Sequence, residues 1–392
     1  MRGPCDVWSP VGDDGGAVVV VRTRGLWRWA VVGAAAALVV GVPAVVVAVT
    51  TPSGTVDAGA LRDRVARSAD QAYQGVAVVR GTSALPALPK LEDVTALLTG
   101  VTTVRSWYRS PERWRFDVVS TAGERDTYRA PGGEFVWDYG ANQLTQLIGT
   151  PAVRLPRAGD LVPPELARRL LATAAGDVVT ALDAREVAGR RADGLRLVPA
   201  DPDTTIGRVD VWADEETGVP LQVEVTPRGA DRPILTTAFD RFTPGAPDDG
   251  VLVPELALGA GFTAVDAPDV AGALGFLGGD PPQASLAGRP LRQADGAGVR
   301  GVGVYGAGLA SFVALPVPRE VGSSVADAGT KAGAGDVTVP QGRIVSLAVP
   351  PLSVVIARST VARRWYLLVG MVDTSVLRAA ATELIAQPRR GR

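Results

Sequence analysis

The sequence predicts an α+β protein built on antiparallel sheets, and three observations support this fold class. The 392 residues include 46 glycines and 30 prolines, which is high for a helical protein and indicates many turns. Valine-rich runs recur along the chain and favour strands. Segments with helical periodicity are few and lie between groups of strands, an order typical of α+β folds.

An apolar segment near the N-terminus is predicted to cross a membrane as a single helix. Residues 29–50 contain no ionisable side chain and are about long enough to span a hydrocarbon core of roughly 30 Å. Arg22, Arg24 and Arg28 precede the segment, so the positive-inside rule places residues 1–28, as a leader, in the cytoplasm. The alternative is a cleaved secretory signal, which the length of the apolar run disfavours. Both interpretations place the rest of the chain outside the cytoplasm, and the first anchors it to the cytoplasmic membrane.

Residues 57–257 are predicted to form one domain that begins with a helix. Within 57–74 apolar residues recur every four positions, with charged residues between them. Over 113–118 apolar residues alternate with charged ones, and over 135–139 aromatic residues occupy every second position. Each of these two segments is therefore predicted to be a strand with one apolar face.

The second half of this domain repeats the order of a helix followed by strands. The segment 163–175 opens with two prolines and groups its leucines on one face, as an amphipathic helix does. Alternating apolar residues then occur at 195–197, 209–211 and 221–225, and residues 215–218 form a turn between the last two strands. The whole domain is thus predicted to contain one antiparallel sheet with helices packed on it.

A linker and a smaller α+β domain are predicted to follow. Residues 258–289 are rich in proline, glycine and alanine, which is typical of a linker. Residues 290–387 are predicted to contain several strands and a closing helix over 373–385, for which Asp373 is a suitable N-cap. Within this domain the glycine- and alanine-rich stretch 322–338 is expected to be a mobile loop.

Composition excludes several classes of function. The chain has no histidine, so the usual general base and the usual metal ligand are absent. Cys5, the only cysteine, precedes the apolar segment, so the main domains contain neither a thiol nucleophile nor a disulfide. The formal net charge of −1 offers no basic field for nucleic acid. We therefore expect a binding protein that is not an enzyme and that uses no metal and no cofactor.

The order of strands and turns resembles that of a known superfamily. Residues 106–147 (SWYRSPERWRFDVVSTAGERDTYRAPGGEFVWDYGANQLTQL) are similar to the paired strands of LolA-like proteins. The run 187–226 contains the hairpin motif Asp-x-x-Thr-Gly-x-Pro at 214–220, and the strand and helix of 365–385 resemble the end of RseB-type C-terminal domains. The chain thus resembles the LolA-like superfamily, which includes lipoprotein carriers and the RseB and MucB regulators of extracytoplasmic sigma factors.

The resemblance implies a fold and two possible functions. The fold is an unclosed antiparallel half-barrel with helices on its concave face and an apolar cavity between them, followed by the smaller domain. One implied function is to hold a lipid or a lipoprotein acyl chain in that cavity. The other is to regulate an extracytoplasmic sigma factor by contacting a membrane anti-sigma factor, with the small C-terminal domain facing the partner. The superfamily has no catalytic residues to carry over.

Aromatic residues of the predicted strands are the candidate ligand-binding surface, because buried apolar area is what would hold an acyl chain. These residues are Trp107, Trp114, Phe116, Phe135, Trp137 and Tyr139. The alternative is that they are ordinary core side chains packed beneath the helices. A cavity beside them would distinguish the two interpretations.

Three other groups of residues, namely clustered carboxylates, clustered arginines and a glycine-rich motif, could also suggest binding sites. The carboxylates Asp201/Asp203, Asp214/Glu215/Glu216 and Asp248/Asp249 fall in predicted turns and are expected to be solvated. Arg105, Arg109, Arg113 and Arg115 could meet lipid headgroups or an acidic partner, or form a solvated face. The G-x-G-x-x-G match at 301–306 is not expected to bind a nucleotide, because the segment after it reads as a strand where a helix is required.

Overall fold

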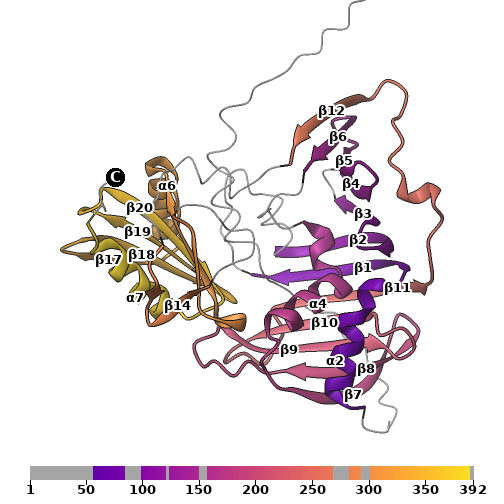
Figure 1. Ribbon diagram of the computed structural model, residues 1–392, viewed down its shortest axis with the longest axis horizontal. Coiled ribbons are helices and arrows are strands. Elements are labelled where there is room, and N and C mark those ends of the chain that lie inside the picture. The colour runs from indigo at the N-terminus through magenta and orange to yellow at the C-terminus, as the bar shows by residue number, and fades with distance from the viewer. Residues whose placement is uncertain are drawn as a thin grey trace, which may run out of the picture.

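The computed structural model describes residues 56–83, 99–120, 123–149, 157–267, 282–292 and 301–388 (Figure 1). Within this part of the chain, no helix is long and apolar enough to cross a membrane. The predicted leader and the predicted membrane span at 29–50 lie outside the described residues.

One sheet of twelve strands forms the larger domain. Its order in space is β12-β6-β5-β4-β3-β2-β1-β11-β10-β9-β8-β7. The strands are β1 (Tyr73–Thr82), β2 (Thr99–Ser110), β3 (Arg113–Ser120), β4 (Gly123–Ala130), β5 (Gly133–Asp138), β6 (Gln143–Ile148), β7 (Val179–Val187), β8 (Arg190–Leu197), β9 (Ile206–Asp214), β10 (Pro220–Pro227), β11 (Leu235–Pro244) and β12 (Gly261–Asp266). Neighbouring strands are antiparallel except β12 and β6, which are parallel. The two end strands, β12 and β7, do not pair with each other, so the predicted unclosed sheet is confirmed.

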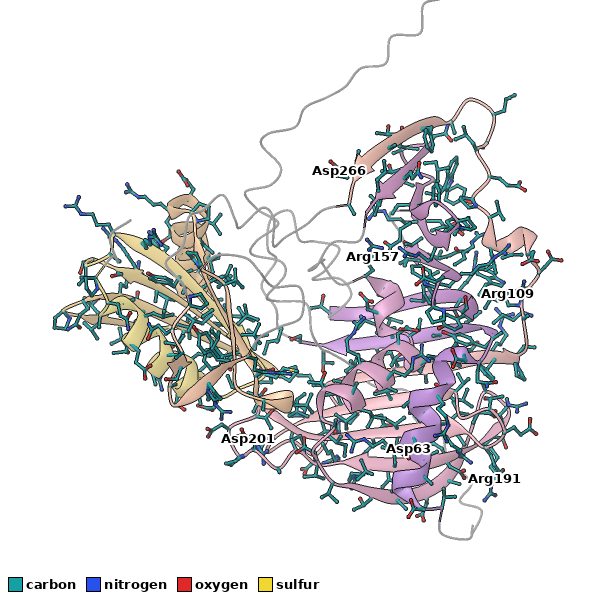
Figure 2. The ribbon with its side chains drawn as sticks, in the orientation of Figure 1. Asp63, Arg109, Arg157, Arg191, Asp201 and Asp266 are labelled. Carbon is teal, nitrogen blue, oxygen red and sulfur yellow. The ribbon has the colours of Figure 1, made fainter. Side chains whose placement is uncertain are left out.

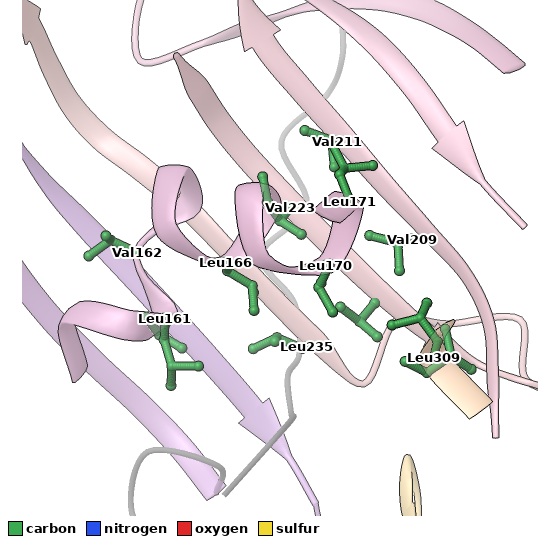
Figure 3. Close-up of a cluster of buried hydrophobic side chains, with 14 of the residues drawn as sticks. Leu161, Val162, Leu166, Leu170, Leu171, Val209, Val211, Val223, Leu235 and Leu309 are labelled. Carbon is green, nitrogen blue, oxygen red and sulfur yellow. The ribbon is translucent and has the colours of Figure 1, made fainter. Parts of the chain in front are cut away.

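Two helices pack on one face of this sheet, over the half that runs from β11 to β7 (Figure 1). The helix α2 (Ala58–Arg67) begins at Asp57, whose carboxylate accepts a hydrogen bond from the Ala60 N–H. The helix α4 (Pro163–Thr173) begins with two prolines and buries Leu166 and Leu170. Figure 3 shows these leucines directed at Val209, Val223 and Leu235 of the sheet. Both helices confirm the sequence prediction, and they fill this half of the domain with a continuous apolar core.

Arg62 of α2 caps the C-terminal end of α4 with hydrogen bonds, and this contact leads to a testable prediction. Its guanidinium donates to the carbonyl oxygens of Leu171 and Asp177 at 2.8 Å each, and also to that of Ala174. The Leu171 carbonyl lies in the last turn of α4, Ala174 is its C-cap and Asp177 follows shortly after, so the cation also meets the C-terminal end of the helix dipole favourably. Replacing Arg62 with alanine should lower the free energy of unfolding by about 2 kcal/mol in urea titrations. Arg67→Ala, on the exposed side of the same helix, should change it by less than about 0.5 kcal/mol, and equal effects would contradict this capping role.

The other half of the sheet, from β2 to β12, has no α-helix of the described chain upon it. A short turn of helix, η2 (Ala158–Leu161), lies on the face that carries α2 and α4, since Gly159 approaches Phe116 of β3. The opposite face is covered by residues 247–255, which include the turn η3 (Gly250–Leu252). This covering segment is held by Asp249, which pairs with Arg109 (labelled in Figure 2) and with Arg113.

The predicted linker over 258–289 contains strands at both ends. Its first part is β12, which pairs along its whole length with β6, so the first sheet continues beyond the expected boundary at 257. Its last part is β13 (Ser285–Leu286), which belongs to the sheet of the second domain. Composition misled the prediction here, because edge strands with exposed side chains need little apolar periodicity.

The second domain is an eight-stranded sheet between two helices. The order in space is β13-β14-β15-β16-β20-β19-β18-β17. The remaining strands are β14 (Arg289–Arg292), β15 (Gly303–Tyr305), β16 (Phe312–Val317), β17 (Gly335–Val339), β18 (Gly342–Val349), β19 (Leu352–Ser359) and β20 (Arg364–Gly370). The helix α7 (Thr374–Ile385) starts at Asp373 as predicted, and its apolar face packs against Val355 and Leu368. The helix α6 (Arg319–Lys331) packs on the other face, against Ile356 and Leu367.

The expected mobile loop at 322–338 is wrong, because this stretch forms most of α6 and of β17. Its small residues have a packing role. A Cβ added at Gly322 would lie 2.5 Å from the ring of Trp365, so the glycine allows α6 to approach β20 closely. Glycine and alanine here indicate a tight helix–sheet contact and not disorder.

The turn between β8 and β9 joins the two domains. Thr204 forms a bridge with Val372, and the Asp373 N–H donates to the Asp203 carbonyl at 2.7 Å. Arg289 of β14 pairs with the carboxylates of Asp201 and Asp203 at 2.8 Å each. The hydrogen bond from Arg289 holds the pKa of Asp201 below its ordinary value. The expectation that Asp201 and Asp203 are simply solvated is therefore wrong, because they anchor the second domain.

Candidate functional site

A cavity of about 400 Å³ lies on the face of the sheet that carries the helices, next to the N-terminal end of α4, where the sheet extends beyond that helix. Its lining comes from β2 to β5, from η2 and from the first turns of α4. The apolar lining is Tyr108, Trp114, Phe116 and Val118, and the charged lining is Glu112, Arg129, Glu134, Arg157, Asp160, Glu165, Arg168 and Arg169. A cavity is thus present at this end of the sheet, but charged side chains make up much of its lining, unlike the apolar cavity that the resemblance implies.

The register of β2 and β3 places the aromatic side chains of Tyr108, Trp114 and Phe116 along one side of the cavity, which we call its floor. Tyr108 lies opposite Trp114, and Ser106 lies opposite Phe116, so alternate residues of both strands face the cavity. The rings of Trp114 and Phe116 are 4.8 Å apart. Gly159 of η2 lies directly over Phe116, and a Cβ there would come within 2.6 Å of the ring. The turn η2, which forms the roof of the cavity, can therefore lie close to the floor only because residue 159 has no side chain.

Tyr108 closes the inner end of the floor. Its ring stacks on Tyr73 at 5.1 Å, and its hydroxyl donates to the Ala69 carbonyl at 2.7 Å. Burial raises the pKa of Tyr108 to about 12, with Arg168 opposing this shift. The hydroxyl therefore stays protonated at neutral pH and acts as a fixed donor to the backbone, not as an acid or base.

The rim consists of ion pairs whose charges balance. Arg157 pairs with Glu134, and Arg169 pairs with Asp160 at 3.0 Å. The Asp160 carboxylate also accepts from the Arg157 N–H at 2.8 Å, which fixes the start of η2. Arg168 pairs with Glu165 on α4. Such a rim can stay hydrated around a polar group while the aromatic floor excludes water.

The structure divides the six predicted site residues between the two faces of the sheet. Trp114 and Phe116 line the cavity. Trp107 lies opposite Arg115, so it faces the other way. Phe135 and Trp137 lie opposite Tyr128 and Asp126, and they too lie on the far face, as does Tyr139, which packs edge-on against Trp137. The sequence prediction of a single aromatic surface is therefore not what the structure shows.

The far face carries a buried ionic cluster beneath the covering segment. Asp117 and Asp126 are both fully buried, and Arg115 donates to both, at 2.6 Å to Asp117 and 2.8 Å to Asp126. The Arg115 guanidinium lies 5.0 Å from the ring centre of Trp107 and 5.0 Å from that of Tyr128. Burial raises the pKa of Asp117 to about 7, although Arg115 opposes the shift. Neither the solvated face nor the headgroup contact weighed for Arg115 describes this position.

This cluster is also where carboxylates come closest to a metal-binding arrangement in the described residues. Oxygen atoms of Asp117, Glu124 and Asp126 lie within 4.8 Å of one another. The Arg115 guanidinium already binds two of these carboxylates, and Arg105 pairs with Glu124 at 3.2 Å. The arrangement is therefore an ion-pair cluster, since a cation would have to displace Arg115.

Sequence reasoning missed the rim and roof of the cavity. Asp160 is the third residue after Arg157, and its side chain accepts from the Arg157 N–H, as the acidic residue of a capping box does at the start of a helical turn. That signal could have indicated a further turn of helix at 158–161. Arg129 and Glu134 lie on neighbouring strands, and nothing in their local sequence shows which face they occupy.

The carboxylates in the predicted turns differ in their surroundings. Asp214 is buried, contrary to the expectation of a solvated side chain, whereas Glu215 and Glu216 are exposed. The G-x-G-x-x-G segment at 301–306 contains β15, and the short turn η4 (Gly308–Ala310) and then the strand β16 follow it, so a strand follows as predicted. It lacks the helix that would hold a phosphate.

Comparisons with known proteins were made for sequence and for structure. No protein-family model matches the chain, and no curated protein matches it. Among solved structures, MucB of Pseudomonas aeruginosa in complex with MucA has a TM-score of 0.49 and 17% identity, over 86% of this chain and 100% of that one. The chain is similar in structure to MucB.

Two further structures extend this comparison. MucB in complex with MucA(peri) has a TM-score of 0.47 and 17% identity, over 83% of this chain and 97% of that one. A LolA superfamily protein from Nitrosomonas europaea has a TM-score of 0.23 and 13% identity, over 51% of this chain and 98% of that one.

Proposed function

We propose that this protein is a membrane-anchored, extracytoplasmic binding protein that holds the acyl chain of a lipid or of a lipidated segment in the cavity beside η2, between the β2–β5 end of the sheet and the first turns of α4. The single observation that supports this function is that the aromatic side chains of Tyr108, Trp114 and Phe116 line a cavity whose rim is charged. The anchor is the apolar segment 29–50, which keeps the binding domain at the outer face of the membrane. Binding without catalysis is consistent with a chain that lacks histidine.

The two kinds of lining suit an amphiphile. Each methylene buried on the floor contributes roughly 0.8 kcal/mol, so an acyl chain gains affinity from area alone. The rim pairs Arg157–Glu134 and Arg169–Asp160 offer charged groups that can contact a polar headgroup, and each of these charges already has a partner. The half of the domain under α2 and α4 is filled by its own side chains, so the ligand must lie at the β2–β5 end.

The division of the aromatic residues between two faces provides a test. The full-length chain would be titrated with a fluorescent long-chain fatty acid, and Trp114→Ala should weaken binding about tenfold by removing floor area. Tyr139→Ala, a matched aromatic deletion on the far face, should leave the dissociation constant unchanged. Equal loss in both variants, or no saturable binding by the wild type, would contradict the proposed site.

A second candidate function is regulatory, and the edge of β12 that pairs with no other strand of the described residues favours it. The N–H groups of Gly261 and Ala267 donate to β6, so by alternation Phe262 and Ala264 direct their backbone groups to the open edge. Phe262 and Val265 are exposed beside this edge. An extended segment of a membrane anti-sigma factor could add to the sheet here as a further strand.

Ala264→Pro tests the regulatory candidate. Proline removes the outward N–H of residue 264 without removing a hydrogen bond to β6. If a neighbouring gene encodes an anti-sigma factor, the substitution should reduce capture of its extracytoplasmic part by the full-length chain at least tenfold, while fatty-acid binding is retained. Unchanged capture would exclude strand addition at β12.

A further inference from the structure

A pair of buried carboxylates on the far face of the sheet remains unexplained by ligand binding. The register of β3 and β4 places Asp117 directly opposite Asp126, and neither side chain is exposed. Like charges directly opposite each other in a sheet are destabilising. Of the described residues, only Arg115 donates charge-assisted hydrogen bonds to this pair, through Nε and Nη2 to Asp117 and through Nη2 to Asp126.

The groups that surround the pair do not supply a second positive charge. From β2, Arg105 faces Asp117 but pairs with Glu124 of β4. From β4, the Tyr128 hydroxyl donates to Asp126 Oδ2 at 3.3 Å. Tyr139 follows β5, and Glu255 of the covering segment lines the adjacent 270 Å³ pocket with Arg115 and Tyr128. Asp126 Oδ1 accepts no hydrogen bond from the described residues.

We propose that Asp117 and Asp126 form a proton-binding site, which holds one proton in the folded protein and loses it as the pH rises through neutrality. Two ionised carboxylates beside one guanidinium leave a single uncompensated negative charge in a buried place, which is costly. One proton removes that charge, and Asp126 Oδ1, which accepts no hydrogen bond from the described residues, is an oxygen that can carry it. The raised pKa of Asp117, about 7 and caused chiefly by burial, agrees with this geometry.

The amino-acid composition makes the titration of this proton easy to detect near neutral pH. The chain has no histidine, so ordinary side-chain titration leaves the range from about pH 5 to 7.5 empty. The α-amino group and Cys5 titrate above most of this range in their ordinary states. A transition near pH 7 in this protein would therefore report the buried pair.

The direction in which stability changes with pH follows from the linkage between proton binding and folding. The carboxyl of Asp117 has an ordinary pKa of about 3.9 in the unfolded chain and a higher one in the folded chain. Between these two values the folded state binds more protons, so stability falls as the pH rises. The unfolding equilibrium constant should increase by up to about tenfold per pH unit between pH 5 and pH 7, and should level off above pH 7.

Urea unfolding of the full-length chain from pH 5 to pH 8 tests the proposal. The wild type should show the slope, and Asp117→Asn should show none, because an amide cannot take up the proton. Asp336→Asn is the matched control, since Asp336 is also paired with an arginine but has a pKa held below its ordinary value by Arg343. That variant should keep the wild-type slope. A slope that persists in Asp117→Asn would overturn the assignment.

A direct measurement avoids dependence on any variant's folding. The carboxyl carbon of Asp117 in the wild-type chain, followed by NMR, should shift with a midpoint near pH 7. A midpoint near the ordinary value of about 4 would refute the proton-binding site. The proposal concerns β3 and β4 alone, so it stands or falls independently of the proposed ligand.

Discussion

Replacing Arg115 with methionine is expected to lower the free energy of unfolding by about 3–5 kcal/mol at pH 7.5, as measured by urea titration. Arg115 is the cation that compensates two fully buried carboxylates, Asp117 and Asp126. Removing one partner of a buried ionic cluster leaves charges that the protein can neither hydrate nor pair. The loss should be smaller at pH 5, because protonation of the carboxyls relieves part of the penalty.

Two further variants separate charge from packing at this position. Arg125→Met removes an arginine from the neighbouring strand β4, where it pairs with Asp138 at the surface, and should cost less than about 1 kcal/mol. The triple variant Arg115→Met, Asp117→Asn, Asp126→Asn should recover much of the stability lost in Arg115→Met. If the triple variant is as unstable as the single one, lost packing against Trp107 and Tyr128 is responsible, and the electrostatic explanation is wrong.

Replacing Asp214 with alanine is expected to cost about 3 kcal/mol at neutral pH. This side chain is 1% exposed and opens the hairpin motif at 214–220. It accepts from Arg190 Nε at 2.6 Å, from the Thr217 N–H at 3.0 Å and from the Thr217 hydroxyl at 2.7 Å. Burial alone would raise the pKa of Asp214, but these hydrogen bonds outweigh it and hold the pKa below its ordinary value.

The same arginine supplies the control for Asp214. Glu216 also pairs with Arg190, at 2.6 Å, but its side chain is largely exposed, so Glu216→Ala should cost less than about 0.5 kcal/mol. A group with a lowered pKa stabilises the fold above its unfolded value and loses that contribution in acid. The difference between wild type and Asp214→Ala should therefore shrink below about pH 4. Equal effects of the two alanine variants would show that burial does not decide the strength of these ion pairs.

The local patterns predicted individual elements well. The alternation in 113–118 correctly separated Trp114 and Phe116 from Arg115 and Asp117, because successive side chains of a strand point to opposite faces. The paired prolines before Glu165 and the capping carboxylate of Asp373 marked true helix starts. These signals act over a few residues, so they are readable without knowledge of the rest of the fold.

Relations between strands were not readable in this way. Trp107 shares alternate positions along β2 with Arg105 and Arg109, whereas Trp114 shares alternate positions along β3 with Phe116 and Val118, and the pairing of β2 with β3 puts the two tryptophans on opposite faces of the sheet. A shift of one residue in register moves every side chain of a strand to the other face, and no single strand encodes its register with a neighbour. The predicted aromatic surface failed for this reason.

By itself, the sequence determined the α+β class, the capped helices, the alternating strands and the absence of histidine that makes neutral pH informative. Only the tertiary structure decided which aromatic residues line the cavity, that Arg115 lies between two buried carboxylates, and that Asp201 joins the domains. Propensity and capping depend on neighbours along the chain. Burial and pairing depend on residues far apart in sequence, and they determine whether the same carboxylate is a solvated turn residue, an anchor or a proton-binding group.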